Sequence, residues 1–487
     1  MRLPGPVRDT SLHVAHAVGE GIDRQVRNHH RRRLRKVGWE HAFDGERAGW
    51  ARDAMEPREG NRAEVLIDGA NVLPRMAEDI AAAESHVHLI GWHFSPELDL
   101  TRGEQPTILR NLLAERAEHA AVRVLMWKGS PLPVFRPTRG DVGTMLRRFA
   151  KSNKIVCASD TCVRQWHCHH EKTIVIDDRI AYVGGIDLTL DGGDPFDTSE
   201  HPARSRVGWH DAAIRLEGPI VADVAEHFKM RWEGATDESL PEPTSQGKRG
   251  DVGLQLVRTV PEEIFDRSLP RGEFSVLGSY VAALRGAKKL IYLENQFLWS
   301  PEIGQVLVDK LENPPSDDFR LVVLLPARAN DGADVSRGQV ASLIHADDGN
   351  GRFLGTTIFA RSATMRDTIY VHSKIGIVDD AWLTIGSANL NEHSLFNDSE
   401  VNVVTLDEGL ARDTRLRLWA EHLERPVEEI DGDSTEVIDE LWNPIADEQL
   451  ERLRADEPIT HRLVKLPGVS KRRGRVIGSV KGRFLDG

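Results

Sequence analysis

The chain has 487 residues, of which 40% are hydrophobic and 29% are charged, a composition typical of a globular protein with two or three domains. No stretch of about 18 consecutive apolar residues occurs, so we expect no membrane-spanning helix. The net charge of −13 argues against a nonspecific nucleic-acid-binding protein, which is usually basic.

The first sixty residues predict a basic extension with a short helix around 12–36 and no signal peptide, so we expect a cytoplasmic protein. Residues 24–36 hold seven Arg and Lys and no acid. A second extension, 431–487, ends in a tail (462–487) with eight Arg and Lys and one acid. Such ends suit anionic lipid headgroups, at roughly 1 kcal/mol per residue near the surface. The alternative is a solvated helix and a solvated tail.

Strands and helices alternate from Glu64 onwards. In the first half, strands are predicted at 64–68, 86–94 and 122–127, with helices at 72–85 and 106–120. The second half repeats this order, with strands at 254–260, 289–299 and 319–326 and helices at 275–289 and 301–314. This alternation predicts an α/β fold, made of two similar α-β-α sandwich domains at 61–240 and 250–430. We expect a linker at 233–253, and loops such as 129–145 and 327–352 around a cleft between the domains.

Each half contains the pattern His-x-Lys-x4-Asp-x6-Gly-Gly or Gly-Ser, which a chain is very unlikely to contain twice by chance. The stretch KTIVIDD alternates like a strand that ends in a turn, and RIAYVGG is its return strand. The His and the Lys, two residues apart on a strand, face the same side and can reach one site. The residues are His170, Lys172, Asp177, Gly184 and Gly185 in the first copy, and His372, Lys374, Asp379, Gly386 and Ser387 in the second.

If the two halves pack about a pseudo-twofold axis, both His-Lys pairs meet in one cleft. One imidazole can then attack as a nucleophile while the other protonates the leaving group. The two lysines suit the oxygens of a phosphate, whose charge must be stabilised in the transition state. The pattern therefore predicts a phosphodiesterase that needs no metal and no cofactor. The alternative is that the pattern marks only a surface strand. Two copies with matching flanks argue against this alternative.

Three cysteines, Cys157, Cys162 and Cys168, lie within twelve residues. Their odd number and close spacing do not fit an extracellular disulfide framework. The stretch CVRQWHCHH offers ligands of a kind found in metal sites. The simpler interpretation is a set of reduced thiols near a strand.

Over most of residues 60–425 the sequence resembles the phospholipase D superfamily. The resemblance is closest to the eukaryotic-type, phospholipid-cleaving branch. It rests on both motifs and on four flanking segments: IGWHFSPEL (90–98), GWHDAAIRLEGP (208–219), IYLENQFL (291–298) and GSANLNEHSLFNDSE (386–400). It implies hydrolysis of phosphatidylcholine and related lipids to phosphatidic acid, and transfer of the phosphatidyl group to alcohols.

The resemblance also implies roles for individual residues. His170 would be the nucleophile that forms a phosphohistidine, and His372 the general acid and then the base. Glu400 would orient His170, and Asp211 would orient His372, each across the interface between the halves. Lys172, Lys374 and Asn389 would bind the phosphate oxygens. Asp177 and Asp379 would brace the turns, next to the structural glycines and Ser387.

Two positions depart from the family pattern. His393 replaces the family's Arg, which removes a fixed cation and can alter substrate preference. Asp187 stands where the second copy has Asn389, as in the eukaryotic-type enzymes, and is doubtful as a phosphate ligand. The first sixty residues are too few for the calcium-binding lipid module of the plant enzymes, so we expect no calcium dependence from that source.

The substrate predicted on this basis is a phospholipid at a membrane surface, with water or an alcohol as acceptor. The enzyme would be a monomer with one active site, in contact with the inner membrane face. One alternative is a cardiolipin synthase, although bacterial members usually carry N-terminal spanning helices. A second is a nuclease of the same superfamily, although the small nucleases carry one motif per chain and the acidic body disfavours nucleic acid. A third is a lipid-binding protein with a decayed site, which the two intact His-Lys pairs disfavour.

Overall fold

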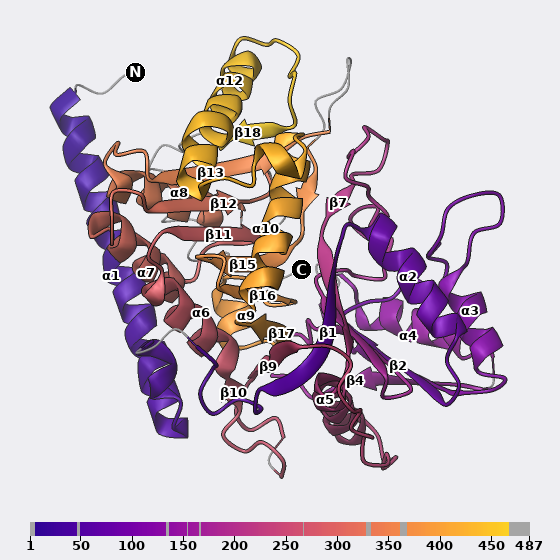
Figure 1. Cartoon of the computed structure of the whole chain (residues 1–487). Coiled ribbons are helices and arrows are strands. Elements are labelled where there is room, and N and C mark those ends of the chain that lie inside the picture. Colours follow the sequence, from indigo (N-terminus) through magenta and orange to yellow (C-terminus); the bar gives the residue numbers. More distant parts are fainter. Residues whose placement is uncertain are drawn as a thin grey trace.

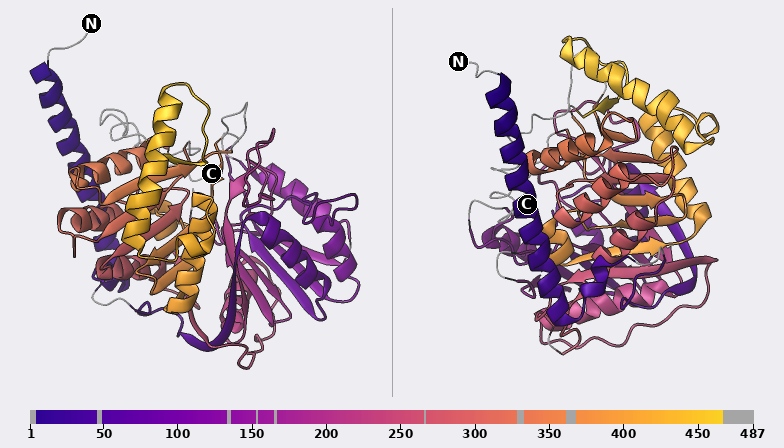
Figure 2. Two further views of the ribbon diagram at one scale, coloured as in Figure 1. Left: turned by 45° about the horizontal axis from the view of Figure 1, so that its top comes forward. Right: turned by 90° about the vertical axis from the view of Figure 1, so that its left-hand side faces the viewer.

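The computed structural model describes residues 5–45, 49–132, 136–152, 154–164, 167–265, 267–327, 333–360 and 368–466; at 5–20 and 333–335 it describes the backbone only. Two α/β halves lie side by side, as Figures 1 and 2 show, and one continuous sheet runs through both. The α/β class and the internal repeat expected from the sequence are confirmed.

The first half contains a seven-stranded block of this sheet. Its strands are β1 (Arg58–Ile67), β2 (His86–Gly91), β3 (Ala121–Trp127), β4 (Ile155–Asp160), β5 (Lys172–Ile176), β6 (Ile180–Gly184) and β8 (Ala212–Glu217). Their order is β4-β3-β2-β5-β6-β8-β1. β2, β3 and β4 are parallel, and the other neighbours are antiparallel. The helices of this half are α2 (Gly69–Ala81), α3 (Leu109–Arg116), α4 (Arg139–Phe149) and α5 (Ile220–Ala235).

The second half repeats this topology. Its strands are β9 (Val252–Val260), β11 (Leu290–Asn295), β12 (Arg320–Leu324), β13 (Phe353–Ile358), β15 (Lys374–Val378), β16 (Trp382–Gly386) and β17 (Glu400–Thr405). Their order, β13-β12-β11-β15-β16-β17-β9, matches that of the first half strand for strand. The helices are α6 (Ser275–Gly286), α7 (Pro301–Glu312), α8 (Ala333–Asp347) and α10 (Glu408–Leu423). The two blocks join where β1 pairs antiparallel with β9.

Smaller elements complete the fold. A two-stranded sheet of β7 (Trp209–His210) and β14 (Tyr370–Val371) links the two halves. The short strand β10 (Glu273–Phe274) pairs with β9, and β18 (Leu463–Lys465) extends the sheet beside β13. The remaining elements are α9 (Glu392–Phe396), α11 (Ser434–Val437), α12 (Asn443–Arg454), the 3-10 helices Glu40–Phe43 and Val427–Glu429, and a π-helix at Ile438–Trp442.

Three large apolar clusters hold these layers together. One packs α2, α3 and α4 on the first half of the sheet, and a second packs α6 and α7 on the second half. The third contains residues of both halves and of α5 and α10, so it lies where the halves meet. Because helices cover both faces, strands such as β12 and β15 are buried along most or all of their length, which explains their continuous apolar sequences.

The first helix, α1 (Gly5–Val37), is longer than the helix predicted at 12–36 and lies against the second half, along α7 (Figures 1 and 2). Leu34 is fully buried, and Arg33 makes a bidentate pair with Glu262 at 2.8 Å. Part of the basic run therefore holds the helix in place. Arg32 and Lys36 in this run are exposed. Among the described residues, no helix combines the length and the apolar character that crossing a bilayer needs.

The structure corrects two expectations. The stretches 129–145 and 327–352 were expected to be loops, but α4 and α8 occupy much of them. The start of α4 is a capping box, in which Thr138 and Asp141 bind each other's backbone N–H groups. In the expected linker, α5 continues to Ala235, and only 236–251 lacks helix and strand. The domain bounds themselves stay predictions.

Candidate active site

Each motif forms a β-hairpin with a two-residue turn, β5–β6 in the first half and β15–β16 in the second. The turns are Asp177-Asp178 and Asp379-Asp380, and all four residues have φ between 52° and 55°. Two consecutive left-handed residues are the geometry of a type I′ turn, which matches the twist of paired strands. Asp tolerates this conformation better than most residues, which explains the Asp-Asp pair in both copies.

Asp177 and Asp379 brace the hairpins at the end far from the histidines. Asp177 accepts three backbone N–H groups at the start of β2, at 2.7–2.9 Å. Asp379 accepts three at the start of β11, at 2.7–2.8 Å. Partial burial would raise the pKa of Asp177, but these hydrogen bonds hold it well below its usual value. Both carboxylates therefore fix a hairpin to the antiparallel strand beside it, β2 in the first half and β11 in the second.

His170 lies just before β5 and is oriented by a carboxylate of the other half. Its Nδ1 is 3.0 Å from Oε1 of Glu400, the first residue of β17. The hydroxyls of Ser387 and Ser394 each donate to Glu400 at 2.5 Å, and the backbone N–H of His170 donates to Ser399. The position of this imidazole is thus set mainly by the second half.

His372 has the reciprocal arrangement. Its Nδ1 is 2.7 Å from Oδ2 of Asp211, which precedes β8 in the first half. Its ring stacks on Trp209 with centroids 4.5 Å apart, and its backbone N–H donates to the carbonyl of His210. Because Nδ1 contacts a carboxylate in both histidines, Nε2 is the ring nitrogen available for chemistry in each. The roles of these four side chains stay predictions.

The two motif lysines lie against the histidine backbones. Lys172 donates to the carbonyl of His170 at 2.6 Å, and Lys374 donates to that of His372. An ammonium carries three N–H groups, so each lysine can also bind a ligand. Asp187 lies between the pairs, with Oδ2 3.5 Å from Lys172 Nζ and 3.9 Å from His372 Nε2. It is therefore placed to balance charge in the site.

Burial and mutual charge perturb the ionisation of this site. Burial, followed by the positive charge of Lys374, lowers the pKa of His372 well below its usual value. Burial also lowers the pKa of Lys374 to about 7 and raises the pKa of Asp211 to about 6 and that of Glu400 to about 8. Burial thus opposes the charged form of each of these four groups.

The Gly-Gly and Gly-Ser positions leave room for the orienting carboxylates. A Cβ on Gly185 would lie 2.2 Å from Oδ1 of Asp211, and one on Gly184 would lie 2.5 Å from a backbone oxygen of β8. A Cβ on Gly386 would lie 2.2 Å from the side chain of Asn402. The counterpart of Gly185 is Ser387, whose hydroxyl contacts Glu400. The two copies therefore differ at this position. Gly185 leaves room for the carboxylate of Asp211, whereas the hydroxyl of Ser387 donates a hydrogen bond to Glu400.

Asn389 is buried, and its amide donates to Gln296 at 3.3 Å. Its Oδ1 has no hydrogen-bond partner among the residues that the structure describes. Within the described residues no hydrogen bond connects it to a motif histidine or lysine. Its contact with a phosphate stays a prediction.

The residue between His and Lys in each motif was overlooked, although on a strand it must point away from the site. Glu171 is fully buried and pairs with His169 at 3.1 Å and His227 at 2.5 Å. Ser373 donates to Glu294 at 2.9 Å. Each motif therefore rests on a buried polar network on the far side of its strand.

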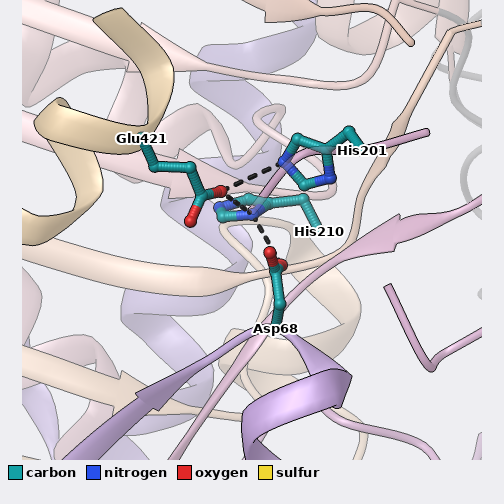
Figure 3. Close-up of side chains that lie close together, drawn as sticks. All are labelled: Asp68, His201, His210 and Glu421. Atoms are coloured by element: carbon teal, nitrogen blue, oxygen red, sulfur yellow. Dashed lines mark hydrogen bonds and ion pairs between the residues drawn. The ribbon is translucent and has the colours of Figure 1, made fainter. Parts of the chain in front are cut away.

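The network behind His372 continues into the cluster of Figure 3, which brings together Asp68, His201, His210 and Glu421. His210 Nδ1 is 3.0 Å from Asp68, and His201 Nε2 is 3.0 Å from Glu421. The carbonyl of His210 accepts the backbone N–H of His372, so this cluster helps to fix the position of the second motif histidine. Its donors, two imidazoles and two carboxylates, are types that bind metal ions. The expectation that no metal is needed stays a prediction.

The structure agrees with the interpretation of the three cysteines as reduced thiols. Burial raises the pKa of Cys157 to about 12 and that of Cys162 to about 11, so both thiols stay protonated near neutrality. Within the described residues, none of the three cysteines forms a disulfide bond. Among the described residues, no cysteine belongs to a close group of metal-binding side chains.

Comparisons with known proteins agree with the resemblance. A family model described as "Cardiolipin synthase, PLD-like domain" matches residues 280–420. Phospholipase D A of Dictyostelium discoideum is 26% identical, over 74% of this chain and 35% of its own length. Phospholipase D alpha 4 of Arabidopsis thaliana and phospholipase D2 of Bos taurus are each 25% identical, over 74% and 72% of this chain and 64% and 50% of their own length. The chain thus spans between about a third and two thirds of these relatives.

One solved structure extends the comparison to the fold. Phosphatidylserine synthase from Haemophilus influenzae Rd KW20 superposes with a TM-score of 0.52 at 11% identity. The superposition covers 81% of this chain and 93% of that chain. It therefore includes both halves and supports the two-domain arrangement.

Proposed function

We propose that this chain, which belongs to the phospholipase D superfamily, cleaves the phosphodiester bond of glycerophospholipids and releases phosphatidic acid and the free headgroup. The observation that carries this proposal is the pair of crossed contacts His170–Glu400 and His372–Asp211. Two imidazoles that present Nε2, with two lysines beside them, suit a two-step displacement at phosphorus.

In the first step Nε2 of His170 attacks phosphorus, the bond to the headgroup oxygen breaks, and His372 gives its proton to that oxygen. In the second step His372 takes a proton from water or an alcohol, whose oxygen attacks the phosphohistidine and releases His170. Glu400 and Asp211 fix the imidazoles and, when ionised, stabilise their charged forms. Lys172, Lys374 and Asn389 are assigned to the phosphate oxygens, whose charge the two ammonium groups offset.

Transfer to an alcohol is the second candidate outcome, because it differs from hydrolysis only in the acceptor of the second step. The match to the PLD-like domain described under cardiolipin synthase favours testing it. We place the enzyme in the cytoplasm as a monomer that meets lipid at the inner membrane face. The exposed Arg32 and Lys36 of α1 support contact with anionic headgroups.

The test is a headgroup panel in vesicles, with and without ethanol. We expect headgroup release in water and phosphatidylethanol when ethanol is present. A covalent phosphoenzyme should be trapped in wild type and be absent in His170→Ala, whereas His372→Ala should mainly slow leaving-group departure. No turnover of any lipid headgroup would refute the proposal. Cleavage of DNA in a parallel gel assay would favour a nuclease.

A further inference from the structure

Another group of side chains of the types that bind metal ions lies beside the candidate active site, formed by His167, His393 and Asp398. One nitrogen of each imidazole and one oxygen of the carboxylate lie within 4.8 Å of one another. His393 and Asp398 are buried, and His167 is partly buried. His167 precedes the first motif, whereas the other two residues belong to the second half.

The backbone holds these three residues together. The carbonyl of His393, in α9, accepts the backbone N–H of Asp398 at 2.8 Å, so the two side chains meet at one end of a tight turn. The N–H of Cys168 donates to Oδ1 of Asp398 at 2.9 Å, and the N–H of Ser399 donates to the carbonyl of Cys168 at 3.1 Å. These bonds fix His167 next to the carboxylate.

The geometry points to a metal ion, and we propose that His167, His393 and Asp398 bind a first-row divalent cation such as Zn²⁺. Tetrahedral zinc with bonds of about 2.0–2.1 Å separates its ligands by about 3.3 Å. His167 Nδ1 lies 3.3 Å from Oδ1 of Asp398. This Nδ1 atom is buried and has no hydrogen-bond partner in the part of the chain that the structure describes. Its polar contact is therefore with a carboxylate, at a separation that suits two ligands of one ion.

Three protein ligands leave further coordination positions for water or another donor. A cavity of about 370 Å³ between α1 and α9 adjoins the group. It is lined by His167 and His393 and also by His29, His30, Glu392 and Asn397. His393 occupies the position at which the family pattern has Arg, a side chain that stays protonated and does not bind metals. The site therefore depends on the residue by which this chain departs from the pattern.

The ion would connect the two halves at the active site. Asp398 and Ser399 immediately precede Glu400, and the carbonyl of Ser399 accepts the backbone N–H of His170 at 3.0 Å. A cation bound to both His167 and Asp398 would fix this segment against the start of the first motif. The bound ion would thereby act on the position of Glu400 rather than on the substrate.

The test uses the full chain, stripped with a chelator and titrated with Zn²⁺, with Co²⁺ absorption as a report on ligand geometry. We expect zinc binding that weakens by at least about 100-fold in His393→Arg and in His167→Gln, because loss of a ligand costs more than loss of a supporting hydrogen bond. The matched control is His29→Gln, which lines the same cavity outside the group and should bind zinc as wild type does. Zinc should also raise the Tm of wild type and of the control but not of the two variants.

The cluster of Figure 3 and the adjoining group of His210, Glu294 and His422 provide competing sites, so His201→Gln and His422→Gln belong in the same experiment. Loss of zinc in either of these variants, with unchanged binding in His393→Arg and His167→Gln, would assign the ion to a competing site and overturn the proposal. Wild-type protein that binds no zinc would overturn it as well. His167 is partly exposed, so His167→Gln decides the question even if His393→Arg does not fold.

Discussion

The contact between Asp211 and His372 requires that position 185 carry no side chain, and Gly185→Ala tests this directly. An added Cβ would lie 2.2 Å from Oδ1 of Asp211, whereas ordinary van der Waals contact begins at 3.4 Å. The carboxylate must therefore retreat by about 1 Å, and a misplacement of that size can cost on the order of 100-fold in rate. This movement would weaken the contact between Oδ2 of Asp211 and Nδ1 of His372, which are 2.7 Å apart.

The assay is headgroup release from phosphatidylcholine vesicles, with kcat and KM measured separately. Gly185→Ala should lower kcat by about 100-fold and leave KM nearly unchanged, because the lysines proposed to bind the phosphate are not displaced. Gly432→Ala is the matched control, since a Cβ there meets nothing within 4 Å. Thermal unfolding of both variants separates a loss of folded protein from a loss of rate. If folded Gly185→Ala keeps kcat within about twofold of wild type, the reasoning on Asp211 is wrong.

Three further predictions concern stability. Burial raises the pKa of Glu400 to about 8, so ionising it opposes folding and wild type loses stability as the pH rises from 4.5 to 8. The free energy of unfolding of Glu400→Gln should therefore rise relative to that of wild type over this range, by about 5 kcal/mol in urea unfolding, and a constant difference would contradict this. Asp379→Asn weakens three hydrogen bonds from backbone N–H groups and should cost about 2 kcal/mol in the same assay, with kcat per folded molecule unchanged. Arg33→Met removes the pair with Glu262 and should speed proteolysis within α1; equal cleavage rates would show that other contacts hold the helix.

The sequence predicts much of this fold because its main signals are local. The alternation in KTIVIDD and the Asp-Asp pair predict the hairpins, and the repeated order of strands predicts two similar halves. α4 was missed because two glycines and four charged residues hide its periodicity, although Thr138 and Asp141 carry a capping signal. The docking of α1 on the second half was not predictable, because it depends on contacts such as Arg33–Glu262 between distant segments.

The same distinction holds for the site. Glu400 and Asp211 could be named only through the resemblance, since no spacing rule connects residues 230 and 161 positions away from their histidines. The network of Glu171 has a local signal, because the alternation of the strand turns the residue between His and Lys away from the site. The cluster of Figure 3 had none, because its members come from four separate segments and meet only after the halves pack.

The crossed histidine–carboxylate pairs also determine when during synthesis and folding the active site can become complete. During synthesis the first half emerges with His170 in place but without Glu400, which lies 230 residues further along the chain. A nascent chain that ends before Glu400 cannot make this contact, so a complete site requires that both halves have been synthesised and have docked. We expect the same in refolding from denaturant, where circular dichroism should recover before activity does. Activity that returned together with secondary structure would mean that the halves dock as they fold.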